Sequence, residues 1–365
     1  MSAHGSVALF SDSYITARQR FREAATQLGC VQEAHAIDQQ GLNGEELTID
    51  VAITPGARTD RTLVISSGLH GVEGYFGSAV QLELLQSWAA GGNTTLPVRC
   101  VFLHALNPYG FAWRRRVNES NVDLNRNLLT AGEAFSGSPV GYAALDDLLN
   151  PRCAPARFEP VMLKFLLAIA RQGMPALLQA VASGQYDFPK GLFYGGVAPS
   201  RTHAILAANV ERWLAGSERV MHLDLHTGLG PWARYKLLLD TAVDKAEQQD
   251  LARWFGTDSF ECVDDPAAAY STRGSFGGWC AAHRGGRHYL YATAEFGTYR
   301  VLRVLTGLRA ENQAHHWASP GDPRIARAKR QLVELFCPRS PDWRSQVIAR
   351  SNQLVQQAIA GLLEV

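Results

Sequence analysis

The sequence lacks several features that define other classes of protein. No stretch approaches the roughly 18 uninterrupted apolar residues of a membrane-spanning helix, and the N-terminal residues have neither a basic start nor a long apolar run. Basic and acidic residues nearly balance, at 35 and 34. We therefore expect no signal peptide, no membrane partner and no nucleic-acid partner, because nucleic-acid binding needs a basic surface.

A disulfide framework, a serine nucleophile and a domain linker are also missing. The six cysteines are scattered without a C-x-x-C pair, which fits a reduced, cytoplasmic location. No G-x-S-x-G segment occurs, and this disfavours a serine hydrolase. Because there is no repeat, low-complexity tract or Ser/Pro-rich linker, residues 1–365 are interpreted as a single domain. The sequence does not indicate the oligomeric state.

Helix and strand patterns alternate along the chain. Apolar spacings of three and four predict a helix from Tyr14 to Leu28, and alternation over Leu47–Ile53 predicts a half-buried strand. Five near-continuous apolar runs are typical of strands buried on both faces. These runs are 63–65, 98–103, 220–225, 237–239 and 289–294, and helical stretches are expected at 78–88, 161–182, 202–215 and from 323 onward. This order predicts an α/β fold with a mixed, largely parallel sheet flanked by helices.

The stretch from about 128 to 200 differs from its surroundings. It is richer in Gly, Pro and Ala than the neighbouring residues. We interpret it as an inserted, partly helical segment within the domain. Its Gly191–Gly196 portion could narrow a nearby cleft and favour small substrates.

Polar residues follow the apolar runs at points where an α/β sheet binds ligands, outside the carboxyl ends of its strands. His70 and Glu73 lie in S-S-G-L-H-G-V-E-G, directly after the run 63–65. Imidazole and carboxylate are good zinc ligands, and two such groups plus a third leave a position open for water. Taken alone, the H-x-x-E spacing also arises by chance.

A second cluster lies in the run that ends near residue 226. His222, Asp224 and His226 share one face of a strand, because side chains alternate along it. His226, at the strand end, is the better candidate for a third ligand. Asp224 is placed to orient a ligand through a hydrogen bond. We interpret His222 as a core histidine with its hydrogen bonds satisfied.

Glu295 closes the run 289–294 and begins the segment E-F-G-T. A carboxylate at the end of a buried strand is costly unless it has a partner or a function. It could serve as the base that takes a proton from water and returns it to a leaving amine. The alternative is a structural carboxylate paired with an arginine.

The segment 114–127 contains three consecutive arginines followed by V-D-L-N-R-N. A guanidinium beside an amide can bind a carboxylate, so Asn125 and Arg126 are candidate substrate-binding residues. A further arginine could stabilise an oxyanion. The alternative, a solvated basic loop, suits Arg114 and also Arg115 better than it suits Arg126.

These segments together closely resemble the zinc carboxypeptidase superfamily. The matching segments span residues 70–298 in the order of the family: His70…Glu73, Asn107–Gly110, Val122–Asn127, His226–Gly228 and Glu295. The nearest similarity is to a bacterial branch that shares E-F-G-T and lies beside the aspartoacylase and succinylglutamate desuccinylase relatives.

The resemblance implies an eight-stranded mixed sheet and one zinc ion. It implies that His70, Glu73 and His226 are the zinc ligands and that Glu295 is the catalytic base. It further implies that Asn125 and Arg126 bind a substrate carboxylate.

Two positions depart from the family pattern. The short loop after the arginines prevents assignment of the oxyanion arginine by spacing, so Arg116 is the candidate and Arg115 the reserve. The substrate-capping tyrosine has no clear counterpart, and Tyr270 is the candidate because Tyr289 and Tyr291 fit sheet packing better.

Three functions remain open on these grounds. The first is a zinc metallohydrolase that cleaves an amide or peptide bond next to a free carboxylate, like a carboxypeptidase. The second is an N-acyl amino acid deacylase that uses the same residues. The third is a catalytically silent zinc- or ligand-binding protein, which the complete set of ligands and base argues against. The expected partner is accordingly a small peptide or an N-acyl amino acid.

Overall fold

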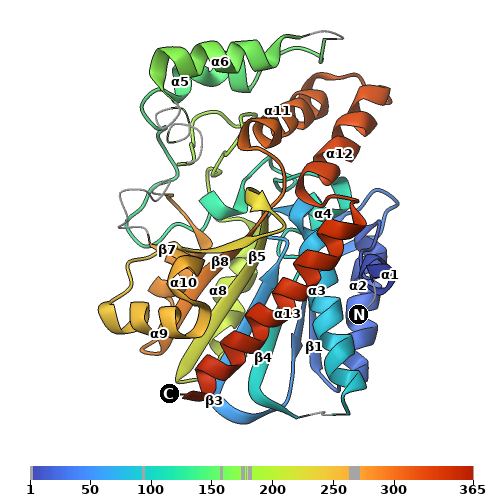
Figure 1. The fold of residues 1–365 in the computed structure, drawn as a ribbon. Coiled ribbons are helices and arrows are strands. Elements are labelled where there is room, and N and C mark those ends of the chain that lie inside the picture. The colour runs from blue at the N-terminus through green and yellow to red at the C-terminus, as the bar shows by residue number, and fades with distance from the viewer. Residues whose placement is uncertain are drawn as a thin grey trace.

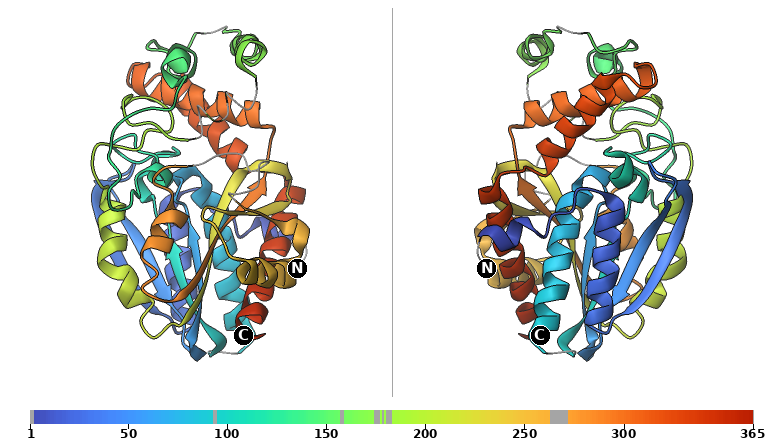
Figure 2. Two further views of the ribbon diagram at one scale, coloured as in Figure 1. Left: turned by 90° about the vertical axis from the view of Figure 1, so that its left-hand side faces the viewer. Right: turned by 90° about the vertical axis from the view of Figure 1, so that its right-hand side faces the viewer.

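The computed structural model describes residues 3–92, 95–156, 159–173, 177, 179, 183–262 and 272–364. Within them the chain forms an eight-stranded sheet covered by helices on both faces (Figures 1 and 2). The strands are β1 (Val31–Gln40), β2 (Glu46–Ile53), β3 (Gly56–Ser67), β4 (Leu96–His104), β5 (Arg219–Trp232), β6 (Tyr235–Leu239), β7 (Phe260–Cys262) and β8 (His288–Gly297).

The order of strands across the sheet is β1-β2-β4-β3-β5-β8-β6-β7. Parallel pairing joins β4, β3, β5 and β8 in the centre and β6 to β7 at one edge. Antiparallel pairing joins β1 to β2, β2 to β4 and β6 to β8. The sheet is therefore mixed as predicted, but it is parallel only in its central part. The prediction of a largely parallel sheet was too broad, because apolar runs do not encode strand direction.

The six predicted strands all occur, but one of them, β2, is more deeply buried than predicted. Strand β2 was expected to be half-buried, yet most of both its faces are buried. Its polar face is covered by the first long helix, where the Tyr14 hydroxyl donates to the Thr48 carbonyl at 2.9 Å and Arg22 pairs with Asp50 at 2.6 Å. Strand β1 was not predicted, because it is an exposed edge strand of mostly polar residues.

The helices agree broadly with the sequence patterns, except that the stretch expected at 161–182 is helical as α6 only to Gln172, and most of 174–182 lies outside the described residues. The first long helix begins after its cap, Ser13, and is followed by Gly29 with a φ of +77°. Residues 337–340 separate the last two helices, as the prolines there predict. The helices are α1 (Ala3–Val7), α2 (Tyr14–Gln27), α3 (Gly74–Ala90), α4 (Pro108–Trp113), α5 (Tyr142–Leu149), α6 (Val161–Gln172), α8 (Arg201–Trp213), α9 (Lys245–Phe255), α10 (Phe276–Ala282), α11 (Val301–Trp317), α12 (Pro323–Phe336) and α13 (Pro341–Glu364), with short 3-10 turns at η1 (Gly71–Glu73), η2 (Leu124–Arg126) and η3 (Thr257–Ser259).

Two apolar clusters organise the described residues. The larger cluster fills the space between the sheet and its covering helices, with α2, α3 and α13 on one face and α8 and α10 on the other (Figure 2). The smaller cluster joins α5, α6, α11 and α12 beyond the carboxyl ends of the central strands (Figure 1). The interpretation of about 128–200 as an insertion within a single domain stays a prediction. No helix among the described residues is long and apolar enough to cross a membrane.

Candidate metal centre

The carboxyl ends of three neighbouring parallel strands bring the predicted site residues together. His70 and Glu73 follow β3, His226 lies near the end of the buried part of β5, and Glu295 lies at the same level on β8. His226 and Glu295 are direct neighbours in the register of the two strands. Parallel strands end at one edge of a sheet, so this convergence follows from the topology.

His70, Glu73 and His226 form a compact set of metal-ligating groups. One ligand atom from each lies within 4.8 Å of the other two, and all three residues are buried. His70 Nδ1 lies 2.9 Å from Glu73 Oε1, and His226 Nδ1 lies 3.2 Å from Glu73 Oε2. The Thr227 N–H also donates to Glu73 Oε2 at 2.9 Å. Both imidazoles thus turn Nδ1 toward the carboxylate and toward one common point.

The other nitrogen of each histidine faces a buried aspartate. His70 Nε2 lies 3.1 Å from Asp123 Oδ1, and His226 Nε2 lies 2.6 Å from Asp224 Oδ2. Burial opposes ionisation of Asp224, but His226 outweighs it and lowers the pKa of Asp224 to about 2. A carboxylate behind a histidine fixes the tautomer and the ring orientation that a metal ligand needs, and Asp224 does this for His226. At His70, Nε2 also lies 2.7 Å from Arg116 Nη2, so Asp123 orients the ring without alone fixing its tautomer.

Asp224 is itself held in place by hydrogen bonds. The Ser66 hydroxyl donates to Asp224 Oδ1 at 2.5 Å, and the Tyr291 hydroxyl donates to Oδ2 at 2.9 Å. His222 lies deeper, with Nε2 at 2.7 Å from Ser66 Oγ and Nδ1 at 2.8 Å from the Tyr289 hydroxyl. Burial lowers the pKa of His222 to about 4, so it stays neutral near pH 7. This environment agrees with the interpretation of His222 as a satisfied core histidine.

Glu295 is the second carboxylate of the site. One of its oxygens, Oε1, accepts a hydrogen bond from the Leu229 N–H at 2.8 Å. Burial raises the pKa of the Glu295 carboxyl to about 7, and the nearby Glu73 carboxylate adds to the rise. In contrast, His70 and His226 outweigh burial at Glu73 and lower its pKa. One carboxylate is therefore held ionised, whereas the other can exchange a proton near neutral pH.

The three consecutive arginines point to different places. Arg114 has a φ of +55° and ends α4. Arg115 is 1% exposed and donates to Glu311 at 3.0 Å, away from the site. Arg116 lies in the site, with Nη1 3.4 Å from Glu73 Oε1 and Nη2 2.7 Å from His70 Nε2. Of the two candidates for the oxyanion arginine, Arg116 therefore lies in the site and Arg115 lies away from it.

Asn125 and Arg126 lie beside the triad on the turn η2. The Asn125 side-chain oxygen accepts from the Phe276 N–H at the start of α10, at 2.9 Å. The Arg126 guanidinium donates to the Asn125 carbonyl at 2.6 Å. Both side chains line the cleft that contains the metal-ligating residues. Tyr270, the candidate capping residue, lies outside the described residues, so its role stays a prediction.

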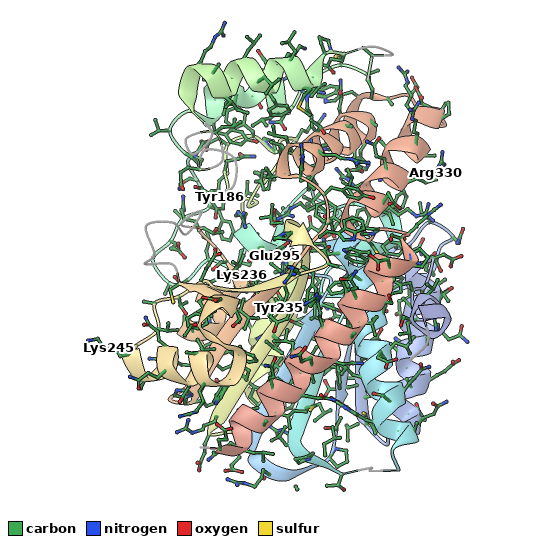
Figure 3. The ribbon with its side chains drawn as sticks, in the orientation of Figure 1. Tyr186, Tyr235, Lys236, Lys245, Glu295 and Arg330 are labelled. Carbon is green, nitrogen blue, oxygen red and sulfur yellow. The ribbon has the colours of Figure 1, made fainter. Side chains whose placement is uncertain are left out.

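The cleft has a volume of about 970 Å³ and extends well beyond the triad. On one side it follows the strand β6, where Lys236 is the cross-strand neighbour of Glu295 and lies close to it in Figure 3. Asp240, just after β6, also lines this side. On the other side, apolar residues of α11 and α12 border the cleft. Clefts of this size normally bind small molecules or short peptides.

Sequence reasoning overlooked two residues of the site. Asp123 was seen only as part of V-D-L-N-R-N, although its carboxylate also binds Arg116 Nε at 3.0 Å. Phe193 was hidden in the 191–196 segment, yet its ring lies 5.4 Å from the guanidinium carbon of Arg116 and 5.9 Å from that of Arg126. The acidic residue in the motif was a usable signal for Asp123. Nothing in the sequence singled out Phe193.

The chain is similar to several solved structures. Bovine thrombin-activatable fibrinolysis inhibitor, solved in complex with tick carboxypeptidase inhibitor, has a TM-score of 0.51 and 11% identity, covering 96% of this chain and 97% of that chain. Carboxypeptidase A from Helicoverpa armigera has a TM-score of 0.43 and 12% identity over 93% and 73% of the two chains. Murein-tripeptide amidase MpaA from Escherichia coli O157 has a TM-score of 0.37 and 18% identity over 80% and 93%.

The similarity to the first structure shows a carboxypeptidase-like fold, which agrees with the fold that the sequence resemblance implies. No curated protein sequence matches the chain. The family model described as "Protein of unknown function (DUF2817)" matches residues 10–350, which is most of the chain. The chain therefore belongs to the DUF2817 family and has a zinc carboxypeptidase-like fold.

Proposed function

We propose that this protein is a zinc-dependent amidohydrolase that cleaves an amide or peptide bond next to a free carboxylate. One observation carries the proposal. The three metal-ligating residues lie beside a buried glutamate, Glu295, whose pKa is raised to about 7. A metal site next to a base poised near neutral pH is the combination that hydrolysis by activated water requires.

The donor set of the triad fits zinc. Two imidazole nitrogens and a carboxylate are a common catalytic zinc set, and ligand atoms of a tetrahedral zinc lie about 3.3 Å apart at bond lengths of about 2.0–2.1 Å. Here Glu73 lies 2.9 Å and 3.2 Å from the two imidazoles, so small shifts would admit an ion. When bound, zinc would polarise the scissile carbonyl and lower the pKa of water.

The residues of the chain supply the remaining steps. Glu295 takes a proton from the attacking water and delivers it to the leaving amine, a role that a pKa near 7 suits. Arg116 donates hydrogen bonds to the carbonyl oxygen as that oxygen becomes negative. Asn125 and Arg126 bind the substrate carboxylate, because an amide beside a guanidinium offers convergent donors.

An N-acyl amino acid deacylase is the second candidate. It would use the same residues on a smaller substrate. The packing of Phe193 against Arg116 and Arg126 favours it, because the ring narrows the cleft at the point where a longer peptide would continue. The third candidate is a zinc- or ligand-binding protein without catalytic activity, and the raised pKa of Glu295 argues against it. A cytoplasmic location stays a prediction from the cysteine usage.

Purified protein, zinc analysis and one substitution test the proposal. We expect about one zinc per chain, loss of turnover with a chelator and recovery when zinc is returned. Glu295→Gln should lower kcat by about 10²–10⁴-fold, since general-base catalysis contributes that much, while zinc stays bound. A rate comparison on a short peptide and on acyl-glutamate or acyl-aspartate separates the first two candidates. Substantial turnover by Glu295→Gln would refute the assigned base.

A further inference from the structure

One wall of the cleft is not used by the proposed chemistry. It is formed by one side of α11 and by the end of α12, and its side chains are entirely apolar. The members of this wall are Val301, Val304, Leu305, Leu308 and Phe336. Four of the five belong to the smaller apolar cluster and are at most 5% exposed, so the wall is preformed by packing. We call this set the apolar wall.

The apolar wall reaches the reacting groups. A Cβ placed on Gly228 would lie 3.0 Å from Phe336 Cε1 and 3.7 Å from Glu295 Oε1, so the Phe336 ring and Glu295 both lie close to Gly228. Phe193 also belongs to the smaller apolar cluster and stacks over Arg116. Its φ of +59° is strained for a residue with a side chain, and such strain clusters at functional sites. Apolar surface thus extends to the metal-ligating residues.

The apolar wall and the residues proposed to bind the carboxylate lie on different elements: the wall lies on α11 and α12, whereas Asn125 and Arg126 lie on the turn η2. Asn125 is fixed by the start of α10, and the Arg126 carbonyl accepts from the Tyr186 hydroxyl at 2.7 Å. In Figure 1, α10 lies at the lower left and α11 and α12 at the upper right, and Glu295 in Figure 3 lies between them. A substrate whose carboxylate binds at Arg126 therefore extends its acyl group toward the apolar wall.

No described side chain of the apolar wall carries a charge. Of the charged residues of α11, Glu311 pairs with Arg115 at 3.0 Å, Arg309 pairs with Glu159 at 2.6 Å, and Arg303 stacks on Tyr299. The cationic side chains that line the cleft, among them Arg234, Lys236 and Arg350, lie outside α11 and α12. A charged acyl group against the wall itself would lose its hydration with no charged wall residue beside it, whereas an aliphatic group would gain from burial. The wall consequently distinguishes acyl groups by polarity.

We propose that the apolar wall is an acyl-binding site and that the substrate is an amide whose carbonyl side is an aliphatic or aromatic acyl group. The proposal rests on the proposed amidohydrolase function and adds the chemical class of the substrate. An N-acyl amino acid with an apolar acyl chain satisfies both ends of the cleft. Short or acidic acyl groups, such as acetyl and succinyl, leave the wall unfilled or bury a charge on it.

A series of N-acyl derivatives of one amino acid tests the proposal in the zinc-loaded protein. From acetyl through butanoyl to octanoyl, kcat/KM should rise about three- to fourfold for each added CH₂ until the wall is covered. Butanoyl should exceed succinyl by at least about tenfold, because the two chains have equal length and differ in the terminal carboxylate. Equal rates along the series, or a preference for succinyl, would overturn the proposal.

Two substitutions locate the effect on the apolar wall. Val301 is only partly buried, so Val301→Asp should fold and should lower the ratio of kcat/KM for the octanoyl substrate to that for the acetyl substrate by at least about tenfold. Val304→Phe should remove the advantage of octanoyl over acetyl by filling the site. Leu163→Asp is the matched control, since Leu163 is 56% exposed on α6 and does not line the cleft. An equal loss for octanoyl and acetyl in Val301→Asp would contradict the assignment.

Binding to zinc-stripped protein separates this proposal from the proposed function. Calorimetry with acetate, butanoate and octanoate needs no turnover, and affinity should increase with chain length and fall in Val301→Asp. If no amide is hydrolysed but this binding order holds, the acyl site stands and the amidohydrolase proposal fails. If amides are hydrolysed but octanoate binds no better than acetate, the acyl site is wrong and the hydrolase proposal stands.

Discussion

The two sides of the cleft are built on opposite principles. On the sheet side, strand ends and the turn η2 crowd ionisable groups together, and His70, Glu73 and His226 lie within reach of one ion. On the helix side, the apolar wall offers no charge, and the charges of α11 are neutralised behind it. The sheet side can hold a metal and a base because its carboxylates have different pKa values. The helix side has no such groups, so it can only bind apolar parts of a ligand and exclude water from the cleft.

Two neighbouring arginines divide between these sides. Arg116 contacts the metal-ligating residues, whereas Arg115 is buried against Glu311 on α11. The left-handed turn at Arg114 ends α4 just before they diverge. Adjacent residues of one type therefore lie in different environments, one in the cleft and the other in a buried ion pair. The following predictions test this difference between the two sides of the cleft.

The largest effect is expected from removal of a metal ligand on the sheet side. His226→Ala should lose bound zinc and reduce turnover to background, because the remaining groups cannot hold the ion tightly. Zinc analysis of the purified variant and an activity assay measure this. His288→Ala, a partly buried histidine outside the cleft lining, is the control and should keep both. Normal zinc content in His226→Ala would exclude His226 as a ligand.

The next largest effects are expected from alanine substitutions of Arg116 and Arg115, which we compare directly. Arg116→Ala should lower kcat by about 10²–10³-fold, as expected for loss of an oxyanion donor, and should also lower the free energy of unfolding, because buried Asp123 and Glu73 lose an ion-pair partner. Arg115→Ala should lower that free energy by about 3–5 kcal/mol, because it leaves Glu311 buried with one partner fewer, but it should leave kcat nearly unchanged. Steady-state kinetics and urea unfolding of both variants provide the test. Exchanged effects on kcat would reverse our assignment of the two arginines.

A smaller effect, on zinc affinity, is expected from substituting the aspartates that contact the two histidines. Asp224→Asn and Asp123→Asn should each weaken zinc affinity by about 10–100-fold, because each aspartate orients a ligand ring. Competition with a chelator of known affinity measures this. Exposed Asp38→Asn serves as the control. Unchanged zinc affinity in both buried variants would show that the rings are held by packing alone.

The smallest effect concerns pH and the helix side. Burial opposes ionisation of Glu311, but Arg115 and Lys329 outweigh it and lower the pKa of Glu311 to about 2. Its stabilising contribution is therefore complete above the usual carboxyl pKa of about 4.5 and is lost as the pH falls toward 2.

Urea unfolding between pH 6 and pH 3 tests this dependence. The stability difference between the wild type and Glu311→Gln should shrink as the pH falls. Exposed Glu46→Gln is the control and should show no such trend. A constant difference for Glu311→Gln would mean that its charge does not contribute.

The sequence was informative wherever chemistry depends on residue type and short spacing. Five apolar runs and one alternating segment predicted six strands, and the spaced motifs located the residues that the structure brings together at the strand ends. The antiparallel pairing of β6 with β8 was not readable, since strand direction depends on connections through space. Strand β1 was missed because an exposed edge strand needs no apolar pattern.

The sequence by itself therefore determined the fold class and the candidate ligands, because backbone burial and metal affinity act on local patterns of residue type. Only the tertiary structure decided which arginine enters the site, that Asp123 lies behind His70, and that α11 lines the cleft with apolar residues. Those facts depend on contacts between segments up to about 200 residues apart, as between Arg115 and Glu311, and packing of the whole chain sets such distances.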